Sequence, residues 1–201
     1  MIQDFLGIIP AQYTGKEIEV FASLEIDNQD EAVLQYEIVK ERLLNVNNWH
    51  HVAGFVSAKF QIVDLSGKEV YRHCQLGDYL KIDIPGPGSK EGEGYDWVCI
   101  EELKEVNTTE IRSLGFTVRP SHNPQKNSTE IAHFYSSGTT SSFIVVLEYS
   151  KVTAWVVDRN LKPNDNTDSL IDKIRDSTIG VGAIGIFSRV QWQNLVDGLV
   201  K

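Results

Sequence analysis

Sulfur is scarce in this chain, whose 201 residues include two cysteines, Cys74 and Cys99. Their spacing fits neither a paired-thiol motif nor a set of zinc ligands, and two cysteines do not make a disulfide framework. The adjacent His50 and His51 cannot both point a ring at one metal ion, and His73 is distant in sequence. We therefore assign the cysteines packing roles, and we predict no metal site and no cofactor.

Long apolar runs and clusters of positive charge are also missing. No segment approaches the roughly 18 apolar residues that a membrane span requires, and the short apolar run at 5–10 lacks the preceding Lys or Arg of a secretory signal. The 28 acidic and 19 basic residues give a net charge of -9, which disfavours binding to nucleic acid or anionic lipid. These features predict a soluble, cytoplasmic protein with no nucleic-acid partner.

Motifs that identify common enzyme classes are absent as well. The chain has no Gly-x-Ser-x-Gly nucleophile elbow. The glycine-rich segment 85–94 resembles a phosphate-binding loop, but it lacks the Gly-Lys-Ser/Thr ending and carries Glu91 and Glu93. Because it lies between two predicted strands, we interpret it as a hairpin loop; its functional form would be a lid over a cavity mouth.

The periodicity that is present starts with a strand and a helix pair. Apolar residues alternate with mainly polar ones over 18–26, which is typical of a strand with one covered face. Helical spacing follows, with Asn28 or Asp30 available as the N-cap. A second short helical turn begins at Trp49, so the predicted helix pair covers 31–54.

Strand signals then continue without an intervening helix, which favours an antiparallel meander. The predicted strands cover residues 55–64, 79–84, 96–106, 114–119, 131–136, 142–149 and 152–158. Capping residues at 166–168 begin a helix that continues to residue 201. The fold class is therefore α+β: one domain over 1–201, with a curved antiparallel sheet of about seven strands wrapped around a long C-terminal helix.

Glycines interrupt the predicted C-terminal helix. Gly180, Gly182 and Gly185 each cost about 1 kcal/mol relative to alanine in a helix interior. One interpretation is that Gly182 and Gly185 line a cavity and make room for a ligand or for close contact with the sheet. The other is that the helix breaks near Gly180 and a second helix begins there.

This order of elements, a strand, a helix pair, six or so antiparallel strands and a long C-terminal helix, resembles that of the START-like or polyketide cyclase-like (SRPBCC) superfamily, which has the helix-grip fold. The resemblance covers about residues 16–201 and includes the helix that runs into Asn47-Asn48-Trp49 and the stretch 187–199. It implies a hydrophobic cavity between the sheet and the C-terminal helix, which binds lipids, sterols, hormones or polyketides. Some members are cyclases, hydrolases or co-chaperone-like partners.

Polar residues of neighbouring predicted strands are candidate ligand contacts. Arg119 ends one strand, and His133 and Tyr135 share one face of the next. If these strands pair, the three side chains converge on one end of the cavity as an anion anchor and a proton donor and acceptor. The alternative is that His133 and Tyr135 face solvent or satisfy buried hydrogen bonds, and that Arg119 forms a surface ion pair.

Two tryptophans complete the candidate site. Trp97 follows the glycine-rich loop and is placed to form an aromatic rim, and Trp155 is a candidate for the cavity wall. Both positions are equally typical of core packing, because large aromatic side chains dominate protein interiors.

The predicted cavity is compatible with three functions. The leading hypothesis is binding of a small, largely hydrophobic, lipid- or polyketide-like ligand between the sheet and the C-terminal helix. The second is cyclase- or hydrolase-like acid–base chemistry in the same cavity, by His133, Tyr135 or Glu101. The third is a protein-interaction module whose interior is filled by its own side chains. A smooth apolar pocket would favour the first, convergent polar groups the second, and a sealed core the third.

Overall fold

The chain forms one antiparallel sheet of seven strands in the order β1-β7-β6-β5-β4-β3-β2. The structure is a computed structural model that describes residues 3–54, 57–84, 89–164 and 181–201, with the backbone alone for 181–185. The strands are β1 (Lys16–Glu25), β2 (Lys59–Val63), β3 (Tyr79–Asp83), β4 (Asp96–Asn107), β5 (Ile111–Pro120), β6 (Thr140–Glu148) and β7 (Lys151–Leu161). The helices are α1 (Gln29–Leu44), the short 3-10 helix η1 (Val46–Asn48), α2 (Trp49–Val52) and α4 (Val181–Val200).

The connectivity is that of the helix-grip fold. β1 pairs with β7, while α1, η1 and α2 carry the chain from β1 at one edge of the sheet to β2 at the other. Asn28 caps α1, because its side chain accepts hydrogen bonds from the backbone N–H groups of Asp30 and Glu31. The predicted antiparallel sheet, helix pair and C-terminal helix are thus confirmed, and residues 165–180 of the predicted helix lie outside the described residues.

The predicted strand at 131–136 is wrong, because β5 pairs directly with β6 and this segment forms no ladder. Tyr135 makes a single bridge to Pro163. The backbone groups of the segment bond elsewhere: the Tyr135 N–H donates to the His133 ring, and the Ala132 carbonyl accepts from Trp97. Apart from the bond to the His133 ring, the backbone partners of the segment lie in other parts of the chain, such as Trp97 and Asn164, and they replace the strand pairing that the alternating sequence predicts.

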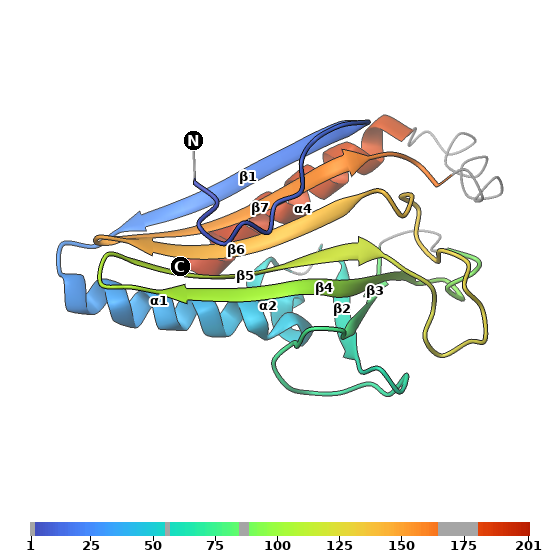
Figure 1. Ribbon diagram of the computed structural model, residues 1–201, viewed down its shortest axis with the longest axis horizontal. Coiled ribbons are helices and arrows are strands. Elements are labelled where there is room, and N and C mark those ends of the chain that lie inside the picture. The colour runs from blue at the N-terminus through green and yellow to red at the C-terminus, as the bar shows by residue number, and fades with distance from the viewer. Residues whose placement is uncertain (1–2, 55–56, 85–88, 165–180) are drawn as a thin grey trace.

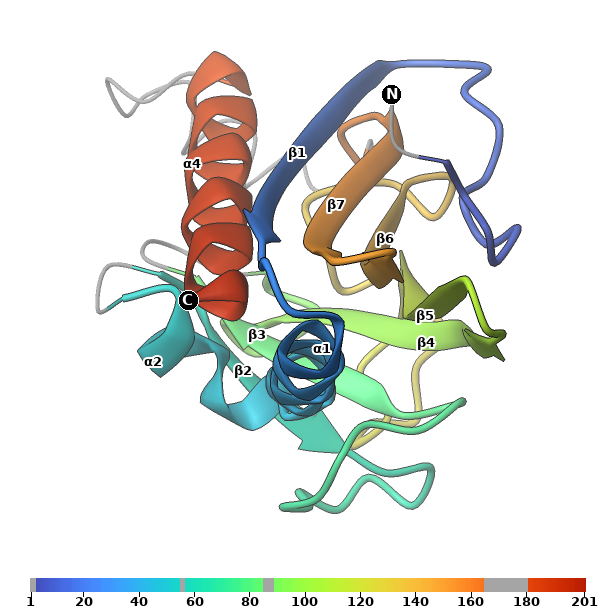
Figure 2. The same cartoon turned by 90° about the vertical axis from the view of Figure 1, so that its left-hand side faces the viewer.

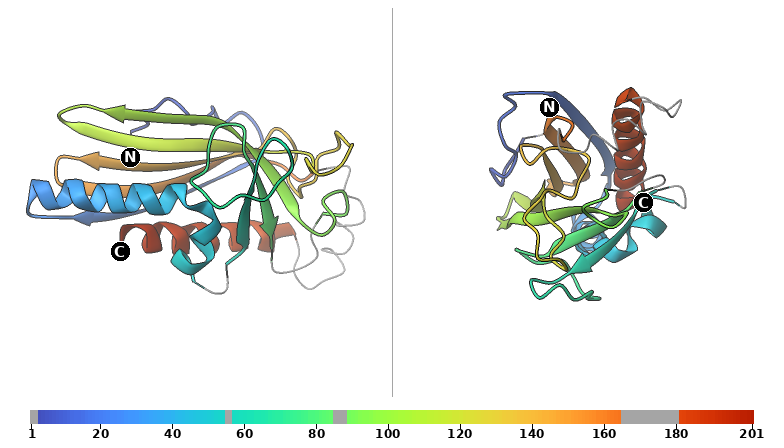
Figure 3. Two further views of the ribbon diagram at one scale, coloured as in Figure 1. Left: turned by 90° about the horizontal axis from the view of Figure 1, so that it is seen from below. Right: turned by 90° about the vertical axis from the view of Figure 1, so that its right-hand side faces the viewer.

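The two long helices cover one face of the sheet. α1 and α4 both lie on this inner face (Figures 1 and 3) and are inclined to each other, since Figure 2 shows α1 end-on and α4 from the side. Leu114, Phe116 and Val118 of β5 point into the core beneath the helices, as do the alternate residues of β6 and β7. None of the helices in the described part of the chain is long and apolar enough to span a bilayer.

The N-terminal segment covers the opposite, outer face of the sheet (Figure 2). Leu6 and Ile8 are buried against Trp155 and its neighbours on β6 and β7. The Thr117 hydroxyl donates a 2.9 Å hydrogen bond to the Ile8 carbonyl. Gly115 makes this approach possible, because a Cβ there would lie 3.0 Å from the Ile8 side chain and 2.8 Å from a backbone oxygen.

Candidate functional site

Five aromatic rings pack against one another between the inner face and the helices. Trp49 of α2 lies at the centre, 5.2 Å from Phe60, 4.9 Å from Phe143 and 6.1 Å from Phe116 between ring centroids. Trp192 of α4 adds a fifth ring, 5.1 Å from Phe143 in an edge-to-face arrangement. We call these five side chains the aromatic cluster.

A carboxyl group is buried beside this cluster. Asp158 lies near the C-terminal end of β7 on the inner face and is 1% exposed. The Trp192 indole N–H donates to its Oδ2 at 2.9 Å. Its Oδ1 is buried and has no hydrogen-bond partner of good geometry among the described residues, although the Ser141 hydroxyl lies close enough to lower the pKa of the carboxyl. A buried carboxyl oxygen without a well-placed donor is costly, and both carboxyl oxygens of Asp96 share this state.

Hydroxyl groups from three elements surround Asp158. Ser141 of β6 is its neighbour across the ladder. The Tyr135 hydroxyl, on the segment before β6, bonds to the side chain of Ser188 on α4, and the Asp158 charge also acts on it. Burial is the main reason why the pKa of Tyr135 rises to about 12. Tyr135 therefore stays protonated and serves as a hydrogen-bond donor or acceptor.

Burial raises the pKa of Asp158 to about 6, against the lowering effects of the Ser141 hydroxyl, the Trp192 N–H and the Arg159 charge. Most of the carboxyl is consequently ionised at pH 7. In that state it can accept a hydrogen bond, pair with a cation or take up a proton.

A second carboxyl, Asp96, is buried on the same face of the sheet at the start of β4. Burial raises its pKa to about 8, although the backbone N–H groups of Ser89 and Phe134 lower it. Asp96 is therefore mostly protonated at pH 7. Asp158 and Asp96 thus differ in protonation at pH 7, and Phe134 beside Asp96 is the sequence neighbour of Tyr135.

The structure does not bring together the three polar residues predicted to converge, Arg119, His133 and Tyr135. Arg119 lies on the outer face of β5, where its Nε donates to Glu101 at 2.7 Å and a terminal nitrogen donates to the Ser137 carbonyl at 2.9 Å. Glu101 is therefore also away from the aromatic cluster. Tyr135 is the member of the group that lies beside Asp158.

His133 is buried and has a structural hydrogen bond. Its Nδ1 accepts from the Tyr135 backbone N–H at 2.9 Å, which places the ring proton on Nε2. Burial lowers the pKa of His133 to about 3, so the ring is neutral at physiological pH. His133 thus positions the segment that carries Tyr135.

The predicted tryptophans lie in other clusters. Trp97 packs with Val63 and Ala132, and its indole N–H donates to the Gly92 carbonyl at 3.4 Å. Trp155 is on the outer face, beneath the N-terminal segment. Gly182 and Gly185 belong to α4, but their surroundings fall outside the described residues.

Asp158 and Asp96 were not among the residues predicted from the sequence. The alternation of each strand contains a signal for their burial. Asp158 is an even number of residues from the buried Val152, Ala154 and Val156, and Asp96 is likewise placed relative to Val98 and Ile100. An acidic residue in register with a buried apolar face is expected to be buried with it.

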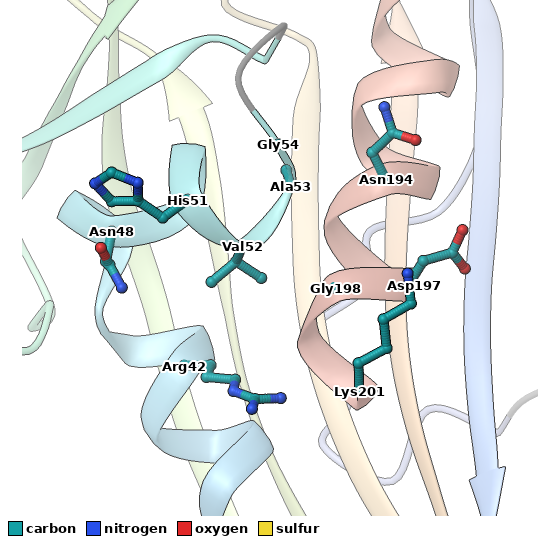
Figure 4. Close-up of a pocket in the computed structure, with 10 residues that line it drawn as sticks. All are labelled: Arg42, Asn48, His51, Val52, Ala53, Gly54, Asn194, Asp197, Gly198 and Lys201. Atoms are coloured by element: carbon teal, nitrogen blue, oxygen red, sulfur yellow. The ribbon is translucent and has the colours of Figure 1, made fainter.

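A pocket of about 530 Å³ opens elsewhere, between α2 and the C-terminal end of α4 (Figure 4). Its lining is largely polar and includes Arg42, His51, Asp197 and Lys201. Arg42 extends from α1 toward the end of α4, where it donates to the Leu199 carbonyl at 2.9 Å. This arginine is thus used to hold the two helices together.

Comparison of the sequence with protein-family models and with curated proteins gives no match. Among solved structures, the chain is similar to a hypothetical protein from Helicobacter pylori, with a TM-score of 0.52, 10% identity, and coverage of 100% of this chain and 98% of the other. Truncated norcoclaurine synthase from Thalictrum flavum gives 0.38 at 7% identity, covering 96% of each chain. Ara h 8.0201 gives 0.36 at 12% identity, covering 90% of this chain and 99% of the other. At 10% identity, the similarity to the Helicobacter pylori protein concerns the fold alone.

Proposed function

We propose that the protein binds a small, largely apolar molecule between the inner face of the sheet and α4, with Asp158 as its polar contact. The observation that carries the proposal is the buried Asp158 Oδ1, which has no hydrogen-bond partner among the described residues. A ligand that donates a hydrogen bond to this oxygen would remove the cost of its desolvation.

The surroundings of Asp158 match a ligand of mixed character. Trp192 and the rest of the aromatic cluster offer apolar contact, at roughly 25 cal/mol per Å² of buried ligand surface before the costs of binding. Tyr135 and Ser188 offer hydroxyl groups beside the carboxyl. Gly182 and Gly185, one helical segment before Ser188, stay predicted lining residues of this site.

Trp192 provides a direct test, because its indole bonds to Asp158. We would purify the protein from its own host, record its mass under native conditions, and identify any released compound after denaturing extraction. A near-stoichiometric apolar compound that changes tryptophan emission on rebinding, with the change lost in Trp192→Phe, is the expected result. A bare chain that takes up nothing from the host's apolar extract would contradict the proposal.

The filled aromatic cluster favours a second candidate, a protein-interaction module. Five rings occupy the described interior, while Leu34 and Ile38 of α1 are exposed one helical turn apart. Under this function a partner protein, rather than a small molecule, co-purifies with the chain, and Leu34→Asp removes it while Trp192→Phe does not.

A further inference from the structure

Among the described residues of the inner face, none carries a charge that compensates that of Asp158. The neighbouring groups from α4, β6 and the segment before β6 are the neutral side chains of Trp192, Ser188, Ser141 and Tyr135. On the neighbouring strand β1, the residue that pairs with Asp158 is the apolar Ile18. No basic side chain of the described residues makes an ion pair with Asp158.

Arg159, whose charge lowers the pKa of Asp158, has its side chain on the outer face of the sheet. It follows Asp158 on β7, so its side chain points to the outer side of the sheet. There it pairs with Glu17 at 3.1 Å and with Glu19 at 3.8 Å, both on β1. Arg159 lowers the pKa of Asp158 through its charge, but it makes no hydrogen bond to the carboxyl.

An ionised carboxylate of this kind distinguishes between ligands. A neutral hydroxyl can donate one hydrogen bond to Oδ1, but the buried negative charge stays unbalanced. A protonated amine supplies both a donor and the opposite charge, and charge-assisted hydrogen bonds are about twice as strong as neutral ones. Its other N–H groups can donate to the hydroxyl oxygens of Tyr135 and Ser188.

We propose that the ligand carries a protonated amine on an apolar body, and that Asp158 binds the ammonium group. This inference rests on the proposed function, since it concerns the ligand class of the same site. It assigns Asp158 the charge contact, Tyr135 and Ser188 the neutral polar contacts, and Trp192 the aromatic one.

Matched pairs of probes test the inference. Binding of benzylamine and benzyl alcohol, and of hexylamine and 1-hexanol, would be measured by ligand-observed NMR on the full chain at pH 7.5. Each pair differs only in the ammonium or hydroxyl group. We expect the amines to bind at least about tenfold more tightly than the alcohols, a difference of about 1.4 kcal/mol.

Two variants locate the binding. Asp158→Asn keeps the size of the side chain and removes the charge, so it should weaken amine binding at least about tenfold and leave alcohol binding nearly unchanged. Asp197→Asn is the matched control, because Asp197 is the carboxylate that lines the pocket between α2 and α4. Loss of amine binding in Asp197→Asn but not in Asp158→Asn would overturn the inference.

The pH dependence of amine binding is a further test, and it is measured on the wild-type chain. Alkylamines, like lysine, stay protonated well above neutral pH, so Asp158 sets the profile: amine affinity rises about tenfold per pH unit below pH 6 and levels off near pH 7. Alcohol binding as tight as amine binding, or amine binding that is flat from pH 5 to 7.5, would overturn the inference and leave the proposed function standing. Failure of all four probes would overturn both.

Discussion

At the scale of single residues, the site is defined by buried groups whose protonation differs from that in the unfolded chain. Asp158, Asp96 and His133 are all buried. Their pKa values move to about 6, about 8 and about 3, and in each case burial is the largest cause. Each group is therefore kept closer to its neutral form than in water, and each makes stability depend on pH.

Asp158→Asn should stabilise the fold at neutral pH. The folded pKa of about 6 exceeds the ordinary 3.8, so the folded state binds more protons between these values and wild-type stability falls as pH rises through that window. The full cost above pH 6 is about 3 kcal/mol at 1.36 kcal/mol per pKa unit. Urea unfolding at pH 7 should show a gain of this order, and at pH 3.5 almost none. The exposed Asp83→Asn is the control, and a loss of stability at pH 7 in Asp158→Asn would contradict the argument.

The pKa shift of His133 makes the stability of the fold depend on pH in the opposite direction. Its lowered pKa means that it stabilises the fold fully above the ordinary value of 6.5, and that this contribution is lost as pH falls toward about 3. Nitrogen-15 NMR of the ring should therefore show a neutral imidazole protonated at Nε2, with no titration between pH 5 and 8. A ring that titrates within this range would mean that burial does not keep His133 in its neutral form.

Residue roles were only partly predictable from the sequence. Tyr135 was predicted to be a polar ligand contact, and the structure places it beside Asp158 of the proposed site. Arg119 was grouped with it on the assumption that 114–119 and 131–136 pair as strands. The alternation of β5 places Arg119 on the other face of the sheet from Leu114, Phe116 and Val118. Which of the two faces is internal depends on the segments that pack against the strand, and these cannot be identified from the sequence of the strand.

At the scale of elements, local signals were sufficient for most strands and for α1. Alternating or continuous apolar runs flanked by turns correspond to β1 and to β3–β7, and the Asn28 cap corresponds to the start of α1. The prediction for 131–136 failed because its backbone groups bond to single residues of other segments, such as Trp97 and Asn164, and to the His133 ring, and these bonds compete with strand pairing. Such competition depends on side-chain geometry, which periodicity does not contain.

Gly198 controls the contact between α2 and α4. A Cβ at this position would clash with the Val52 carbonyl oxygen, so the helices touch through backbone atoms. Gly198→Ala should cost about 1–3 kcal/mol, because the helices must separate to admit the methyl group. Gly138→Ala is the matched control, since the nearest atom to its added Cβ would be 3.7 Å away. Thermal unfolding of both variants measures the difference, and equal melting temperatures would show that the helices adjust freely.

At the scale of the whole molecule, the sheet is covered on both faces by segments from the two ends of the described chain. The helices cover the inner face, and the segment around Leu6 and Ile8 covers the outer one. The unbroken apolar runs of β6 and β7 already indicate two buried faces, because an antiparallel strand with one wet face alternates. What the sequence could not supply was the identity of the outer cover, since the run at 5–10 has no periodicity of its own.

The outer cover makes a prediction about global stability. Ile8 is 2% exposed and packs against β6 and β7, and its carbonyl accepts from Thr117. Ile8→Ala should cost about 2–4 kcal/mol, the typical range for a large aliphatic side chain truncated in a core. Tyr13→Ala, at a site 72% exposed in the same segment, should cost less than about 0.5 kcal/mol. If urea unfolding shows that Ile8→Ala costs no more than Tyr13→Ala, the N-terminal segment is not an integral layer of the fold. If the predicted difference is found, the proposed binding site beneath α4 rests on a sheet that is stabilised from both sides, because β7 carries Asp158 on one face and the Ile8 contacts on the other.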